Sequence, residues 1–255
     1  MKYLFHLLIF LWTPIAYSQE VQVLYPSIGD TIAKSPEGEM AFAKHLEECD
    51  KILDKAKEMG GSDGLSKTES TLFDECLTEK EGYWDVLGMG CSWYCGGGLD
   101  TLTATSELKS YKGISYAASN AHDLSYQTAW VEGVPGYGVG ESLTYHFPPE
   151  NPRITQIIVV NGYIKSPKAW RNNSRVKKLK MYVNGQEFAI LNLEDSRAEQ
   201  FFSFDPLGYA DREDWNILKR KPWWTIRFEI VEVYPGDAYD DTAITEIYFD
   251  GIDVH

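Results

Sequence analysis

The spacing of apolar residues divides the chain into a helical part and a part rich in strands. From Glu37 to Gly60 the apolar positions recur at steps of three and four, which places them on one face of a helix. Gly60 and Gly61 are typical of a helix end. A second, shorter helix is predicted from about Glu69 to Glu79, with its apolar residues facing inward.

After Gly98 the pattern changes to short runs of β-branched and aromatic residues separated by Pro, Gly, Asn and Asp. Asn184 and Gly185 separate two of these runs and are typical of a two-residue hairpin turn. The runs predict a mainly β fold, a jelly-roll β-sandwich preceded by a small helical region. The predicted strands are LDTLTATSEL, ESLTYHF, ITQIIVV, VKKLKMYV, QEFAILNL, AEQFFSF, WWTIRFEIVEV and AITEIYF.

The first residues have the pattern of a signal peptide. Lys2 precedes an apolar run, and Ala16-Tyr17-Ser18 forms a small-x-small cleavage site. The run is shorter than the roughly 20 residues that span a bilayer, and no later segment approaches that length. We therefore expect a signal peptide at 1–18, a helical Cys-containing region at 19–87 and a β-sandwich at 88–255, with a secreted or periplasmic location and no membrane insertion.

The charge of the chain narrows the class of partner. The formal net charge is −14. An acidic protein is repelled by phosphate backbones and by anionic lipid, so no nucleic acid and no membrane surface is expected as a partner.

Four cysteines allow three disulfide pairings. An even number in an exported chain indicates two disulfides. If the two predicted helices pack through their apolar faces, Cys49 faces Cys76, and Cys91 and Cys95 are left to close a small loop. The alternative is a zinc site, because His45 and Cys49 lie four residues apart on one helix.

Several short segments resemble a known family. Asp123, Thr128 and Glu246 have the order of the calcium-binding residues of discoidin-like (coagulation-factor type C), galactose-binding-like jelly rolls, and Trp130 has the place of the core Trp that follows them. Roughly residues 88 to 253 resemble one branch, the NADase-type glycan-binding (translocation) domain. The segments that carry this resemblance are Ala129–Gly133, Gly138–Glu141, Asn161–Tyr163, Asn173–Lys177, Val233–Gly236 and Asp240–Glu246.

The resemblance implies a structural calcium ion. Calcium takes six to eight oxygen ligands, and Asp123, Thr128 and Glu246 would supply two carboxylates and a hydroxyl, with nearby carbonyls completing the shell. No Gly follows Asp123, so the loop departs in detail from the family pattern. The alternative is that Asp123 caps a turn and Glu246 faces solvent. Trp130 is assigned to the core.

The resemblance also implies a sugar site in loops at one end of the sandwich. Sugars need an aromatic platform and a few fixed polar groups. Arg175 suits a bidentate contact with the carboxylate of an acidic sugar. The alternative is that Tyr163 and Trp170 pack the loop and Arg175 pairs with Asp240 or Asp241. The candidate glycan-binding residues are Tyr163, Lys165, Trp170, Asn173, Arg175, Tyr239 and Asp241.

The expected function is a secreted, non-catalytic carbohydrate-binding module. In the family the NAD-cleaving activity belongs to a separate domain, for which the residues before the sandwich are too few. Two alternatives stay open. One is a hydrolase that uses Glu132 with Glu141, or Asp240 with Asp241, as acid and base. The other is an envelope structural or protein-interaction protein.

Overall fold

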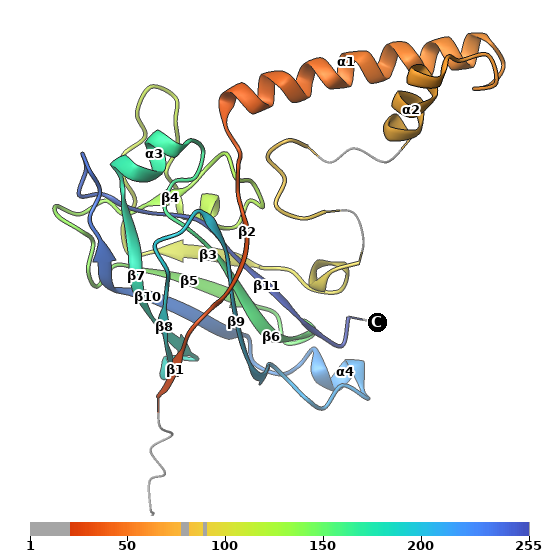
Figure 1. The fold of residues 1–255 in the computed structure, drawn as a ribbon. Coiled ribbons are helices and arrows are strands. Elements are labelled where there is room, and N and C mark those ends of the chain that lie inside the picture. Colours follow the sequence, from red (N-terminus) through yellow and green to blue (C-terminus); the bar gives the residue numbers. More distant parts are fainter. Residues whose placement is uncertain (1–20, 78–81, 89–90, 255) are drawn as a thin grey trace, which may run out of the picture.

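The computed structural model describes residues 21–77, 82–88 and 91–254. The predicted signal peptide and the predicted end of the second helix at Glu79 lie outside these ranges. Figure 1 shows a β-sandwich from which two helices extend. In chain order the elements are β1 (Gln22–Leu24), β2 (Ser27–Thr31), α1 (Pro36–Glu58), α2 (Lys67–Cys76), η1 (Trp93–Cys95), β3 (Thr101–Ala104), η2 (Ala118–Ala121), β4 (Trp130–Val131), β5 (Ser142–Phe147), β6 (Arg153–Asn161), α3 (Pro167–Asn172), β7 (Ser174–Val183), β8 (Gln186–Asn192), β9 (Ala198–Leu207), α4 (Trp215–Leu218), β10 (Trp224–Tyr234) and β11 (Thr242–Ile252).

The strands form two layers around one core. One layer has the order β2-β9-β6-β11, with β4 also on β11, and the other has β8-β7-β10-β5-β3, with β1 on β8. The layers join where β11 pairs in parallel with the start of β7 over two residues. From Trp224 to Ile230 of β10 every second side chain is buried, which is the alternation that a half-buried strand requires. Each of the eight predicted strands is present, and the predicted fold class is confirmed.

Aromatic residues fill the space between the layers. Trp130 and Phe249 are buried there, and Tyr145 and Phe147 pack edge-on against Phe249. Trp93 is also buried and donates from Nε1 to the carbonyl of Pro152 at 3.0 Å. The placement of Trp130 in the core is therefore confirmed.

The hairpin between β7 and β8 has the predicted turn. Asn184 and Gly185 both have positive φ, 50° and 78°, as a two-residue type I′ turn requires. Because this turn matches the twist of the flanking strands, β7 and β8 pair antiparallel on either side of it.

The segment before α1 forms two strands that the apolar pattern does not predict. β1 pairs in parallel with β8, and β2 pairs antiparallel with β9. The chain thus crosses from an edge of one layer to an edge of the other (Figure 1). Both strands are short and largely exposed, so they lack the buried alternation from which strands are recognised.

The two predicted helices are confirmed, with small shifts at their ends. Ser35 caps α1 by accepting a hydrogen bond from the Gly38 N–H at 3.1 Å, and Ser66 and Glu69 form a capping box at the start of α2. Both helices extend away from the sandwich in Figure 1. No helix within the described ranges is both long and apolar enough to cross a membrane.

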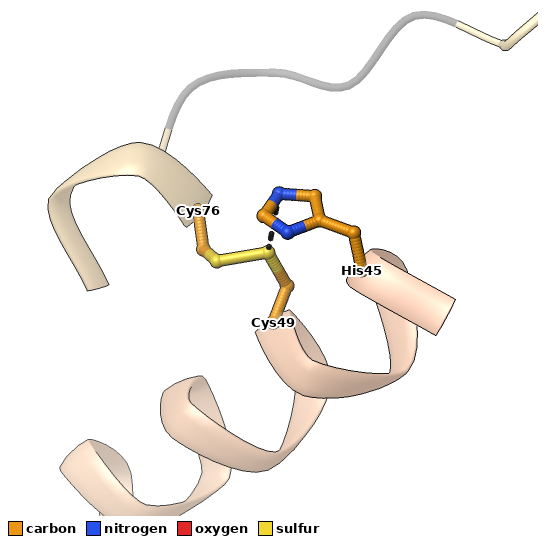
Figure 2. The surroundings of a disulfide bond; sticks show 3 residues. All are labelled: His45, Cys49 and Cys76. Carbon is orange, nitrogen blue, oxygen red and sulfur yellow. Dashed lines mark hydrogen bonds between the residues drawn. A yellow bond between two sulfur atoms is a disulfide. The ribbon is translucent and has the colours of Figure 1, made fainter. Parts of the chain in front are cut away.

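The predicted disulfide between the helices is confirmed. Cys49 is bonded to Cys76, and both are buried (Figure 2). His45 Nε2 lies 3.6 Å from Cys49 Sγ. Since zinc binds thiolates, the disulfide removes Cys49 as the sulfur ligand that the zinc alternative combines with His45.

The second predicted disulfide is absent. Cys91 and Cys95 are exposed thiols, and a hydrogen bond between them lowers the pKa of Cys95. The Ser92 N–H at the start of η1 donates to Cys95 Sγ at 3.4 Å. The prediction of a Cys91–Cys95 bridge is wrong for this structure.

Candidate functional site

The three predicted calcium ligands lie together in the structure. Thr128 Oγ1 donates to Asp123 Oδ2 at 2.6 Å. The N–H of Ser125 donates both to Asp123 Oδ1 at 3.1 Å and to Glu246 Oε1 at 2.9 Å. The strand β11 therefore brings Glu246 to Ser125, which lies 121 residues earlier in the chain, and two carboxylates share one backbone donor.

Glu246 has an environment that disfavours an unpaired negative charge. Its side chain is fully buried, and its Oε2 has no hydrogen-bond partner among the described residues. Burial first, and then the neighbouring Asp123, raise the pKa of Glu246 well above its usual range. The alternative that Glu246 faces solvent is wrong. A buried oxygen without a partner beside a second carboxylate fits a divalent cation, which would offset both the burial and the repulsion.

The loop that carries Asp123 is held from several sides. Leu124 has a φ of 58°, the left-handed conformation that Gly adopts most easily. This explains how the loop turns without a Gly after Asp123. The segment before Gly88 fastens the loop, because Tyr126 N donates to the Trp84 carbonyl at 2.7 Å and Val86 N donates to the Leu124 carbonyl at 3.0 Å.

A separate pocket of about 540 Å³ lies between three loops of the sandwich. One wall is the segment from Leu108 to Tyr116, and a second is α3 with the residues that flank it. The third wall is the segment that leads into β11, and Val131 of β4 also lines the pocket. This is the arrangement expected for ligand sites on a rigid scaffold.

Four of the seven predicted glycan-binding residues line this pocket: Tyr163, Asn173, Tyr239 and Asp241. Tyr239 is 54% exposed, whereas Tyr163 is largely buried, and burial raises the pKa of Tyr163 to about 12. Burial first, and then Asp240, raise the pKa of Asp241. Lys165, Trp170 and Arg175 do not line the pocket as described.

Arg175 has a different role from the one predicted. It is buried, and its Nε and Nη2 donate to the two carboxylate oxygens of Asp195 at 3.0 and 2.8 Å. Its Nη1 donates to the carbonyls of Asn173 and Pro235. The guanidinium also lies over the ring of Trp170, 4.7 Å from its centroid. Arg175 thus joins three loops, and its carboxylate partner is Asp195, not Asp240 or Asp241.

The sequence pattern did not predict that the segment from Leu108 to Tyr116 forms a wall of the pocket. Tyr111 and Ile114 exchange two backbone hydrogen bonds of 3.1 and 2.9 Å across Lys112 and Gly113, which have φ of 49° and 81°. These values define a tight hairpin turn of type I′. The Lys112-Gly113 pair was the available signal, because Gly at the second position of a two-residue turn is favoured there.

Glu132 and Glu141, one of the two carboxylate pairs considered for hydrolysis, are engaged in loop structure. Glu132 is buried, and its two oxygens accept from the N–H groups of Val134 at 2.8 Å and Thr242 at 3.2 Å. Glu141 accepts from Thr105 Oγ1 at 2.6 Å. Burial raises the pKa of Glu132. Both carboxylates therefore stabilise loop conformations.

Comparison with solved structures finds similar chains at low identity. The CBM32-1 and CBM32-2 domains of Clostridium perfringens ZmpB are 11% identical, with a TM-score of 0.41, and the match covers 60% of this chain and 34% of that one. CpGH89CBM32-5 from Clostridium perfringens, in complex with GalNAc-β-1,3-galactose, is 16% identical, with a TM-score of 0.41 and coverages of 59% and 94%. CBM32-3 from a Clostridium perfringens family 31 glycoside hydrolase is 19% identical, with a TM-score of 0.40 and coverages of 59% and 91%. At these identities and TM-scores, the similarity does not indicate which ligand this chain binds.

Comparison with curated protein sequences gives no match. Residues 93–250 match the family described as "NAD glycohydrolase translocation F5/8 type C domain". The match covers more than half of the chain and agrees with the resemblance found in the sequence. This chain therefore belongs to the NAD glycohydrolase translocation F5/8 type C domain family.

Proposed function

We propose that this protein is a secreted glycan-binding module that binds saccharides in the pocket between the Leu108–Tyr116 segment, α3 and the segment leading into β11. The observation that carries the proposal is a pair of exposed tyrosines on different walls. Tyr111 is 63% exposed and Tyr239 is 54% exposed, and both line the pocket. Aromatic rings at the rim of a concave site suit the apolar face of a sugar ring.

Polar groups in the same pocket supply hydrogen-bond partners for sugar hydroxyls. Asn172, Asn173 and Asp241 all line it. Asn172 and Asn173 are held in place by hydrogen bonds to the backbone, because the Tyr239 N–H donates to the Asn172 carbonyl at 2.9 Å, and Asn173 Nδ2 donates to the Ala169 carbonyl at 2.8 Å. A site that is already ordered loses less entropy when it binds a ligand.

We propose calcium as a structural ion of this module, held by Asp123, Thr128 and Glu246. The buried, unpartnered Oε2 of Glu246 supports this assignment. Bound calcium would neutralise the two carboxylates and order the loop before β4. Since Val131 of β4 lines the pocket, this loop would connect the ion to the shape of the sugar site.

The lining of the pocket favours binding over hydrolysis. Glycoside hydrolysis commonly uses two carboxyl groups on either side of the scissile bond. Asp241 is the one carboxylate among the lining residues that the structure describes. Secretion is supported separately by the Cys49–Cys76 disulfide, since such bonds persist in oxidising compartments.

A glycan array followed by calorimetry and a product assay tests the proposal. Tyr111→Ala and Tyr239→Ala should each weaken binding of the best array saccharide by about 1 to 3 kcal/mol, through loss of stacking area. Tyr25→Ala is the matched control, because Tyr25 is 72% exposed and lies outside the pocket. The proposal fails if no saccharide binds, if both variants bind as wild type does, or if the protein releases product.

A further inference from the structure

Two lysines line the pocket from different walls. Lys109 belongs to the Leu108–Tyr116 segment and Lys168 belongs to α3. Both side chains are exposed, and neither forms an ion pair with a residue in the described ranges. The chain has 38 acidic and only 24 Lys and Arg residues, so carboxylate partners are abundant overall. Two lysines that form no ion pair with any described residue are therefore available at one pocket for a negative charge on a ligand.

Hydrogen bonds fix the backbone of both walls that carry these lysines. On the first wall, Leu108 N donates to the Val131 carbonyl at 2.8 Å, and Val131 N donates to the Tyr116 carbonyl at 3.3 Å. On the second wall, Ser166 caps α3 by accepting from the Ala169 N–H at 3.1 Å. The backbone positions of the lysines are thus fixed before a ligand binds, while their side chains stay adjustable.

The pocket has an acidic side and a basic side. Asp241 lines the pocket and Asp240 lies beside it, so this side suits hydroxyl donors and repels an anion. Lys112 adds a third cation near the first wall, with its Nζ 5.2 Å from the centroid of the Tyr111 ring. An acidic substituent would therefore be directed toward the lysine walls and away from Asp241.

We infer that the pocket selects anionic glycans, and that Lys109 and Lys168 bind the carboxylate or sulfate group of the sugar. This inference rests on the proposed glycan-binding function. Charge-assisted hydrogen bonds are roughly twice as strong as neutral ones, so an acidic substituent gains more from these lysines than a hydroxyl does. The anionic preference predicted for Arg175 is thereby retained, but with different residues.

Calorimetry on matched pairs of saccharides tests the inference. The pairs are sialyllactose with lactose, a galacturonate trisaccharide with its methyl ester, and sulfated with unsulfated N-acetyllactosamine. Wild type should bind an acidic member more tightly than its neutral partner, and added salt should reduce that difference. Lys109→Gln and Lys168→Gln should each weaken acidic binding by up to about fivefold while neutral binding stays unchanged. Lys57→Gln on α1 is the matched control and should change neither.

The possible failures are distinguishable. If neutral saccharides bind as tightly as acidic ones, or if the two lysine variants keep the wild-type preference, the inference is overturned and the proposed glycan-binding function stands. If neither these saccharides nor the array glycans bind, the proposed function itself fails. A preference for either the carboxylated or the sulfated member supports the inference and identifies the anion.

Discussion

Replacement of Glu246 by Gln gives the sharpest test of the proposed calcium site. Glu246 is fully buried beside Asp123, and its Oε2 has no hydrogen-bond partner in the part of the chain that the structure describes. In wild type, an ion present at 100 times its dissociation constant stabilises the fold by about 2.7 kcal/mol. For a domain of this size, 1 kcal/mol shifts Tm by roughly 2–4 °C, so saturating calcium should raise Tm by about 5–10 °C over protein treated with EDTA.

Glu246→Gln should abolish this response without unfolding the protein. The amide keeps the shape of the side chain and removes a buried charge, so the calcium-free variant should be at least as stable as calcium-free wild type. Asp250→Asn is the matched control, because Asp250 is an exposed carboxylate on the same strand, and its Oδ1 accepts from the adjacent Gly251 N–H at 2.8 Å. That control should keep the full calcium response.

The pH dependence of the folding stability gives an independent check of the proposed calcium site, and its sign follows from the raised pKa of Glu246. The folded-state pKa of Glu246 is raised above its unfolded value, so folding favours the protonated side chain. This contribution to stability is complete below the unfolded pKa of about 4.3 and is lost as the pH rises through the raised folded pKa. Calcium competes with the proton, so the Tm difference between calcium and EDTA should grow from pH 4 to pH 7.

Differential scanning fluorimetry across this pH range, with calcium and with EDTA, measures both effects. Two results would refute the reasoning. The first is a wild-type Tm that is the same in calcium and in EDTA at pH 7. The second is a Glu246→Gln variant that responds to calcium as strongly as wild type.

Two further predictions concern residues whose roles the structure changed. In chemical denaturation, Arg175→Ala should destabilise the fold by about 3 kcal/mol, which is the low end for a broken buried ion pair because Asp195 is partly exposed. Arg171 is exposed, so Arg171→Ala should have little effect. Equal stability of the two variants would contradict this role of Arg175. In the folded, unreduced protein Ellman's reagent should titrate Cys91 and Cys95, and the Cys95 thiolate should react first because the pKa of Cys95 is lowered. A titration that finds no thiol would support the second disulfide after all.

Local patterns in the sequence were sufficient for the elements whose structure depends on nearby residues. The strand alternation, the Asn184-Gly185 turn and the two amphipathic helices are properties of short segments, and each is present in the structure. The family resemblance also predicted that Asp123, Thr128 and Glu246 lie together, because in that family β11 lies against the earlier loop. The structure has these three side chains in one cluster.

Tertiary structure decided the features that depend on contacts between distant segments. Arg175 could be recognised as a bidentate donor from its chemistry, but its choice of Asp195 over Asp240 or Asp241 depends on how three loops meet. The strands β1 and β2 form only because β8 and β9 offer edges to pair with, since their own residues carry little apolar pattern. Lys109 likewise reaches the pocket only because backbone bonds hold its segment against β4. Such pairings depend on geometry across the whole sandwich, which no local spacing of residues encodes.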